Sequence, residues 1–245
     1  MPGPTAWSWI AALILIAAGC DRDEKSNSPP GAPPPAAPSF PAVAPVAPLA
    51  PPEIIVDSNH VAVGKEQVPT ADRGLAERVA SLLAVPGIEG HAVDVVTMRN
   101  VKPSQVEAVV VALRGAKASS ATLKTLTREG TTQKLAISFS TSTPACTTVA
   151  WIAKDAAIDV WPAGGGVAKR VIRGLAGPDI TLGLEAIGAR QAGCSAPDLV
   201  IGADEAMTWG LVFDLATSAL QAPGARASEA ILVTSATPGR PVELK

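Results

Sequence analysis

The chain has 245 residues, of which 47% are hydrophobic, and its 20 Lys and Arg nearly balance its 22 Asp and Glu, for a formal net charge of −2. This balance argues against a nucleic-acid-binding protein, because such proteins present an excess of basic residues to the phosphate backbone. The length allows one or two domains with substantial hydrophobic cores.

The first segment of the chain is typical of an export signal. Residues 6–19 (AWSWIAALILIAAG) are all apolar or small and are followed at once by Cys20. A bilayer span needs about 20 residues, so this run fits the hydrophobic region of a signal peptide better than a transmembrane helix. The stretch AAGC at 17–20 resembles a bacterial lipobox, in which the cysteine is acylated and becomes the first residue.

We therefore predict a signal peptide over residues 1–19 and a lipid attached to Cys20. The alternatives are an ordinary cleaved signal and an uncleaved short anchor. A lipoprotein signal, an ordinary signal and a short anchor would each direct the chain out of the cytoplasm. The lipoprotein signal predicts a location on the periplasmic side of a bacterial cell envelope, with the protein anchored in the membrane by lipid.

The next segment, residues 20–52, is predicted to be a linker. It begins with a polar, charged stretch and continues as PPGAPPPAAPSFPAVAPVAPLAPP to Pro52. This density of Pro with Ala favours polyproline II and cannot build a core. At about 3.1 Å per residue, a fully extended linker would reach up to roughly 100 Å from the membrane.

The other two cysteines, Cys146 and Cys194, form an even pair in an oxidising compartment, which favours a disulfide over two separately buried thiols. Such a bond would stabilise the fold by ~4 kcal/mol in the chain-entropy model. With two His in the chain and no CxxC pair, the sequence indicates no zinc site, and we predict no cofactor.

The remaining chain is predicted to hold two copies of one pattern, residues 53–142 and 143–245. The first copy begins with two predicted strands, in which branched residues alternate: IIVDSN and HVAVGKEQV. Two helices follow, each with an apolar stripe, ADRGLAERVASLL and SQVEAVVVALRGA, and the strand HAVDVVTM lies between them. The copy ends with a predicted hairpin made of ATLKTLT and TQKLAISF. In the second copy the corresponding segments are AIDVW, VAKRVIRG, a helix capped by Asp179, DLVIGAD, GLVFDLATSALQ, EAILVTS and PVEL, with a turn at Pro238 and Gly239 before the last.

This order predicts an α+β fold made of two tandem small ββαβαβ(β) domains, each a sheet with two helices on one face. Three equivalent pairs, Ile55 with Ile158, Val95 with Ile201 and Ala108 with Leu215, are separated by 103, 106 and 107 residues. A tandem duplication accounts for this spacing.

Residues 198–234 are similar to the periplasmic domain of the ExbD/TolR family. In that family a strand ends in an Ala-Asp pair, a helix begins near an aromatic residue, and a Gly precedes a strand that ends in Thr. The matching residues here are Ala203, Asp204, Trp209, Gly210, Gly224 and Thr234. In the first copy, Arg99 and Asn100 stand near the position of the Asp.

The resemblance implies a role in biopolymer transport beside a proton-driven motor of the inner membrane, where the family's soluble domain dimerises and, in TolR-like members, engages peptidoglycan. The resemblance implies an ExbB/TolQ-like or other inner-membrane protein as the partner, and peptidoglycan as a further one. The family's transmembrane helix carries an essential aspartate, whereas residues 6–19 contain no carboxylate, so this chain cannot itself conduct protons.

We therefore expect a non-enzymatic envelope lipoprotein, accessory to a system for transport or envelope tethering that is driven by proton-motive force. Its two copies would stand in for the family's homodimer. The alternative is a free-standing periplasmic binding module for peptidoglycan or an envelope protein, without motor coupling.

Three further features have both a structural and a functional interpretation. Adjacent Asp204 and Glu205 are expected to be a structural corner rather than a catalytic pair, because strand neighbours point to opposite faces; contact with a partner is the alternative. The glycines and bases of residues 163–170 fit a hairpin turn and match no phosphate-binding pattern. Trp151 and Trp161 are expected in the core or on a sheet face, with a binding anchor as the alternative.

Overall fold

The computed structural model describes residues 50–127, 129–144, 146–195 and 197–244. The predicted signal peptide, Cys20 and the linker up to residue 49 lie outside these ranges. The described residues belong to one compact unit. Within the described part of the chain, no helix is long and apolar enough to cross a membrane.

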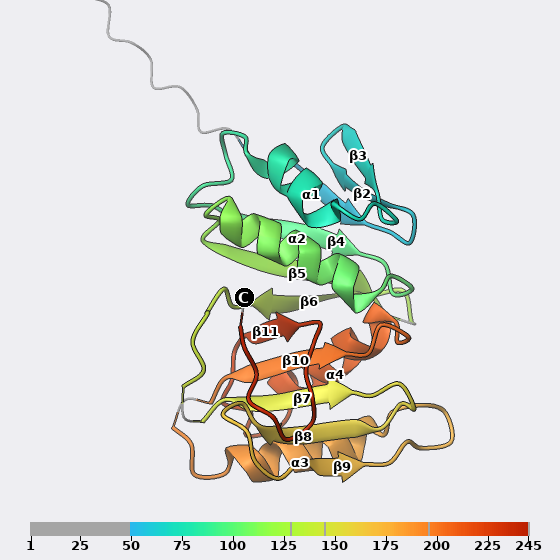
Figure 1. Cartoon of the computed structure of the whole chain (residues 1–245), viewed down its shortest axis with the longest axis vertical. Coiled ribbons are helices and arrows are strands. Elements are labelled where there is room, and N and C mark those ends of the chain that lie inside the picture. The colour runs from blue at the N-terminus through green and yellow to red at the C-terminus, as the bar shows by residue number, and fades with distance from the viewer. Residues whose placement is uncertain (1–49, 128, 145, 196, 245) are drawn as a thin grey trace, which may run out of the picture. The chain divides into compact units, whose positions relative to one another are not determined.

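The described residues form four helices and eleven strands, which we divide into a first half, a second half and a C-terminal segment, residues 234–244 (Figure 1). The first half contains β1 (Ile54–Val56), β2 (His60–Val63), β3 (Glu66–Pro69), α1 (Leu75–Leu83), β4 (Ala92–Thr97), α2 (Pro103–Gly115), β5 (Ser120–Leu126) and β6 (Thr132–Ile137). The second half contains β7 (Thr148–Ile152), β8 (Ile158–Pro162), β9 (Lys169–Val171), α3 (Ile180–Gln191), β10 (Leu199–Ala203), α4 (Trp209–Gln221) and β11 (Ala230–Val233).

All strands belong to a single mixed sheet in the order β3-β2-β1-β4-β5-β6-β11-β10-β7-β8-β9. The mixed α/β composition is as predicted, but the strands do not form two separate sheets. Each half nevertheless has the same strand order and the same pairing directions. The run β3-β2-β1-β4-β5 pairs antiparallel, antiparallel, parallel and parallel, and so does the run β9-β8-β7-β10-β11.

Strand β6 joins the two halves. It pairs antiparallel with β5 and parallel with β11, where Ile137 lies opposite Ala230. β6 thus pairs with the first residue of β11 at its free edge, and the predicted last strand PVEL does not pair with the sheet. The structure corrects that prediction: the C-terminal segment leaves the sheet and crosses one of its faces (Figure 1).

The structure also corrects how the strands of the two copies correspond. Each half begins with three strands, since HVAVGKEQV turns at Gly64 to make both β2 and β3, and β7 precedes the predicted AIDVW strand. Ile55 lies on β1, whose counterpart by sheet position is β7, whereas Ile158 lies on β8. The pairs on β4 and β10 and on α2 and α4 lie on corresponding elements.

One core runs through both halves. It combines the buried residues of all four helices with one face of the sheet. The predicted stripe of α2 is buried there, with Val106, Val109, Val110 and Leu113 all at most 1% exposed. Helix α3 begins as predicted, where the Asp179 side chain accepts a hydrogen bond from the Leu182 amide (3.1 Å). The sheet twists along its length, so α1 and α2 lie in front of it and α4 behind it in Figure 1.

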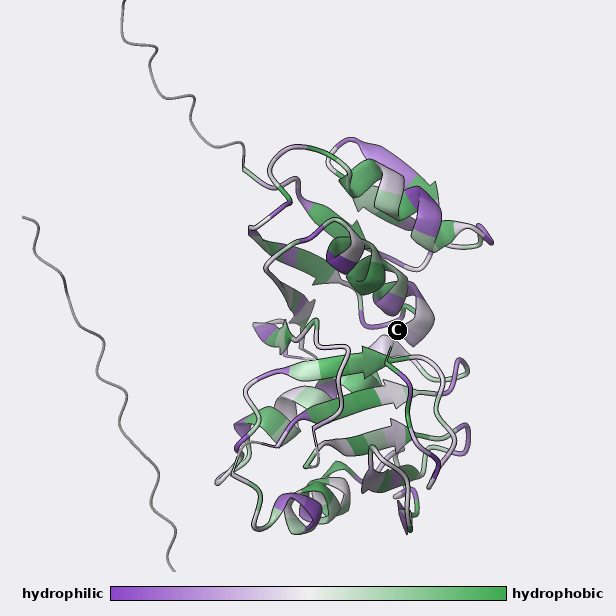
Figure 2. Cartoon of the chain, turned by 60° about the vertical axis from the view of Figure 1, so that its left-hand side comes forward, coloured by the Kyte–Doolittle hydropathy of each residue, from purple (hydrophilic) through white to green (hydrophobic). Residues whose placement is uncertain are grey.

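The opposite face of the sheet, which we call the outer face, differs between the halves. In β4 and β5 buried residues alternate with partly or fully exposed ones, so this face of the first half is open to water. In β7 and β10 every residue is buried, and these strands are largely apolar (Figure 2). The C-terminal segment covers them, with Val242 packed in a cluster that contains Trp151 and Trp161.

Candidate functional site

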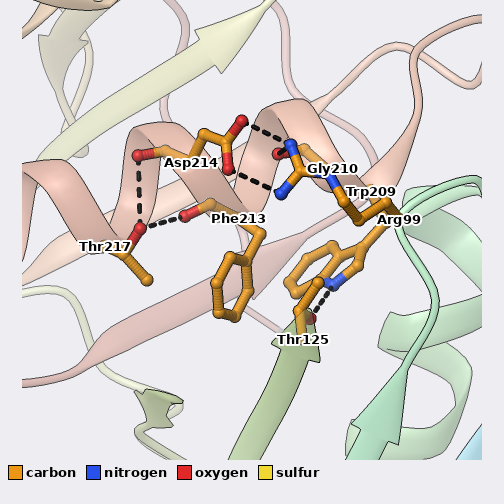
Figure 3. A network of polar contacts seen from close by, with 7 residues as sticks. All are labelled: Arg99, Thr125, Trp209, Gly210, Phe213, Asp214 and Thr217. Carbon is orange, nitrogen blue, oxygen red and sulfur yellow. Dashed lines mark hydrogen bonds and ion pairs between the residues drawn. The ribbon is translucent and has the colours of Figure 1, made fainter. Parts of the chain in front are cut away.

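The halves meet where α4 begins, beside the ends of β4 and β5. Trp209, the first residue of α4, is 1% exposed, and its indole NH donates to the hydroxyls of Thr97 (2.9 Å) and Thr125 (3.3 Å). These threonines lie at the carboxyl ends of two strands of the first half and are 2.5 Å from each other. A residue of the second half therefore has its polar group satisfied entirely by the first half (Figure 3).

The first half also binds the backbone at the start of α4. Thr208, the N-cap residue, makes no side-chain cap. Instead, the amide of Trp209 donates to the Val101 carbonyl (2.7 Å) and that of Gly210 to the Arg99 carbonyl (2.8 Å). A side chain at Gly210 would meet that carbonyl oxygen at 3.1 Å and the Arg99 Cβ at 3.0 Å. The glycine therefore permits the close approach that satisfies these helix amides.

Arg99 and Asp214 form a two-pronged ion pair over this junction. The guanidinium donates to both carboxylate oxygens (2.9 and 2.5 Å) and more weakly to the Gly210 carbonyl (3.3 Å) (Figure 3). The side chains are 24% and 33% exposed. The hydrogen bond with Asp214 raises the pKa of Arg99 above its ordinary value, so this guanidinium stays charged.

A cleft of about 690 Å³ lies against this ion pair, and both halves line it. The first half contributes Arg99 and the residues around the turn from β5 to β6; the second contributes the turn before α3, the start of α3 and the side of α4. The lining residues are Arg99, Thr127, Glu129, Gln133, Gly174, Leu175, Ala176, Gly177, Pro178, Asp179, Ile180, Leu211, Asp214, Thr217 and Ser218.

The lining combines an ion pair with neutral hydrogen-bonding groups. Arg99 and Asp214 are joined to each other by two hydrogen bonds. Thr127, Gln133 and Ser218 supply hydroxyl and amide groups. Among the described residues, no group of three or more His, Cys, Asp or Glu is arranged to hold a metal ion.

Asp204 and Glu205 lie at the corner that follows β10. The Asp204 carboxylate accepts a hydrogen bond from the Ala206 amide (2.9 Å), and its own amide donates to the Ile152 carbonyl (2.9 Å). Glu205 is exposed and lines a different cleft, of about 620 Å³, beside the starts of α1 and α2. Asp204 thus stabilises a turn, and its neighbour lies apart from the cleft between the halves.

The other residues of the sequence motif mark element ends. Ala203 is the buried last residue of β10, and Thr234 directly follows β11. Gly224 has a φ of +81° in the turn after α4, a conformation that favours glycine. Of the six motif residues, Trp209 and Gly210 lie at the junction between the halves.

The structure joins Cys146 and Cys194 in a disulfide, with Cα atoms 5.9 Å apart. Cys146 precedes β7 and Cys194 precedes β10, so the bond links the approaches to two neighbouring parallel strands. Cys20, the predicted lipid attachment residue, lies outside the described residues.

Sequence reasoning found part of this site. The motif pointed to Trp209 and Gly210, and the repeat placed Arg99 near the position of Asp204. It missed Thr97, Thr125 and Asp214, which carry no local signal. Their importance comes from pairings across 84 to 115 residues of sequence.

Comparisons of the chain with family models, with curated proteins and with solved structures found no match in any of the three.

Proposed function

We propose that this chain is a non-enzymatic envelope protein built from two ExbD/TolR-like modules fused in one chain, tethered by lipid at Cys20 and accessory to a system for transport or envelope tethering driven by proton-motive force. The observation that carries the proposal is the repeated order of strands and helices in the two halves. Each half places two helices on one face of its strands, which is the arrangement predicted from the order of elements in each copy.

The way the halves join adds support to this proposal. β6 continues the sheet from one half into the other, and Trp209 and Arg99 make contacts across the junction. A pair of modules held in this way would not need a second chain to complete its sheet. The fused pair would thus replace the homodimer that the resemblance implies.

The cleft favours the second candidate, a periplasmic binding module without motor coupling. It lies between the modules and presents hydroxyl, amide and charged groups, which suit a polar glycan or peptide of the cell wall. In this candidate the partner would be peptidoglycan or an envelope protein that enters the cleft.

The test is affinity isolation of the tagged full chain from its own membranes, with Cys20→Ser as the untethered control. Recovery of an ExbB/TolQ-like membrane protein would support the motor accessory, and recovery of wall fragments alone would support the binding module. Recovery of neither would count against both candidates.

A matched pair of variants locates the contact. Ala176→Trp places a large side chain on the exposed wall of the cleft, while Ala84→Trp adds the same side chain to an exposed position after α1. If the cleft binds the partner, the first variant loses it several-fold and the second does not. Equal recovery with both variants would exclude the cleft as the binding site.

A further inference from the structure

The most exposed apolar side chains of the described residues are gathered in one short segment. Leu175 is 110% exposed, Val167 85% and Ile172 76%, whereas the next large apolar residue, Leu126, is 52% exposed. Leu175, Val167 and Ile172 all lie in residues 163–178, which we call the β9 segment. Single exposed apolar residues are common, but three nearly bare ones in so short a stretch indicate a contact surface.

Local structure explains why these side chains stand clear of the core. β9 is only three residues long and forms one edge of the sheet. After it, a Gly174–Gly177 bridge closes a tight turn with Leu175 inside it. Leu175 lies at the rim of the cleft, and its side chain is so exposed that it projects into solvent.

Basic residues alternate with these apolar ones. The β9 segment contains Lys169, Arg170 and Arg173 and no acidic residue, in a chain whose net charge is −2. Arg170 is paired with Asp155 and Asp159. Lys169 and Arg173 are exposed, and neither forms an ion pair with any described residue.

We propose that the β9 segment docks onto an anionic lipid surface, with Val167, Ile172 and Leu175 entering the interfacial region and Lys169 and Arg173 lying at the headgroups. The protruding apolar side chains fit the boundary between headgroups and acyl chains, and the unpaired cations beside them fit the negatively charged headgroups. The inference rests on the proposed lipid tether, which would keep the segment close to a membrane. Because the same turn forms one wall of the cleft, docking would hold the cleft beside that membrane.

The test uses the full chain reconstituted into vesicles of phosphatidylcholine alone, or of phosphatidylcholine mixed with the anionic lipid phosphatidylglycerol, which supplies the negative surface potential that attracts Lys and Arg. A polarity-sensitive fluorophore is attached at Leu175→Cys, and brominated acyl chains serve as the quencher. Leu126→Cys, labelled in the same way, is the matched control on an exposed apolar position of the first half. The parent chain shows whether Cys20 takes label, which lipidation would prevent.

We expect quenching at position 175 to exceed that at 126 several-fold in anionic vesicles. Changing Lys169 and Arg173 to Gln should reduce docking by roughly fivefold for each cation. Val167→Ser with Ile172→Ser should reduce it as well, and none of these exposed changes should lower the Tm.

Equal quenching at the two positions, or quenching that does not respond to lipid charge or to the Gln changes, would overturn the inference. So would burial of the label that follows protein concentration rather than lipid, because it would indicate a second copy as the partner. Vesicle flotation separates the two proposals: a chain that floats without quenching keeps its tether but not its docking surface. A chain that fails to float contradicts both, since a docked segment would itself hold the chain to anionic vesicles.

Discussion

The Trp209 indole joins residues of both halves through one polar group. Its NH reaches two threonine hydroxyls at strand ends, and its ring meets Phe213 edge-on at 6.0 Å. A buried indole NH without a partner would cost about 1–3 kcal/mol. Placing this aromatic residue at the start of α4 therefore favours the observed junction over others with similar apolar burial.

We expect Trp209→Phe to lower the free energy of unfolding by about 1–2 kcal/mol, because it removes the donor and leaves most of the ring. Trp209→Ala should cost about 3–5 kcal/mol, since it also leaves a cavity. Urea denaturation measures both. Thr97→Val, alone and combined with Trp209→Phe, completes a double-mutant cycle, and fully additive effects would contradict the proposed coupling.

A second cluster at the residue scale gives a prediction about pH. Asp159 on β8 is 2% exposed and accepts a hydrogen bond from Arg170 (2.7 Å), which also donates to the exposed Asp155 (2.6 Å). Burial raises the pKa of Asp159 above its ordinary value, because loss of hydration outweighs the attraction of Arg170. The hydrogen bond from Arg170 lowers the pKa of Asp155.

These shifts have opposite consequences for stability. A raised pKa means that ionisation disfavours the folded state, so Asp159 costs stability as pH rises from about 3.8 through its folded pKa. A lowered pKa means that Asp155 contributes stability above 3.8, which is lost as pH falls through its folded pKa. As pH rises through this window, Asp159→Asn should gain stability relative to the native chain and Asp155→Asn should lose it. Tm measured from pH 2 to 7 (about the range over which carboxyl groups titrate) checks this, and parallel curves for the two variants would refute it.

At the element scale, the disulfide fixes the approach to two central strands of the second half. We expect Cys146→Ser with Cys194→Ser to lower the free energy of unfolding by about 2–4 kcal/mol, because the unfolded chain regains the entropy of a closed loop of 48 residues. Denaturation of the oxidised and the reduced native chain should show the same difference. Cys20→Ser is the control, and an equal effect of that change would point away from the disulfide.

The elements themselves show what a sequence can and cannot predict. Helical stripes and alternating strands revealed all four helices, because burial on one face leaves a period in the sequence. The pattern failed at β3, β7 and the last segment. PVEL has the composition of a strand, yet the edge of β11 that it would extend begins with a pairing to β6, more than one hundred residues earlier in the chain. Competition for a sheet edge is a long-range property that no local pattern records.

The same limit applies to the site. Trp209 and Gly210 could be singled out from a local motif, whereas Asp214 resembles any partly exposed acid on a helix. Its role appears only when the strand order brings Arg99 over α4. The cleft likewise depends on the turn before α3 facing the turn from β5 to β6, which neither turn predicts alone.

At the scale of the whole molecule, the two halves bury their strands differently. The helices cover one face of the sheet in both, but only the second half has its outer face covered as well, by the C-terminal segment. That cover is held by backbone as well as side chains. The Trp161 indole donates to the Arg240 carbonyl (2.8 Å), and the Val242 amide donates to the Ala163 carbonyl (2.9 Å).

Removal of residues 236–245 should therefore destabilise the second half, because it bares an apolar sheet face that includes Trp151 and Trp161. We expect a lower Tm, a red-shifted tryptophan emission and binding of a hydrophobic dye. Val242→Asp, which keeps the backbone of the cover while breaking its apolar contact, should have a smaller effect of the same kind. A change at an exposed position of the first half, Lys134→Asp, is the control, because that half already keeps its outer face in water. If the shortened chain kept the native Tm and emission, the C-terminal segment would not stabilise the second half. The apolar composition of that half's outer face would then need another explanation.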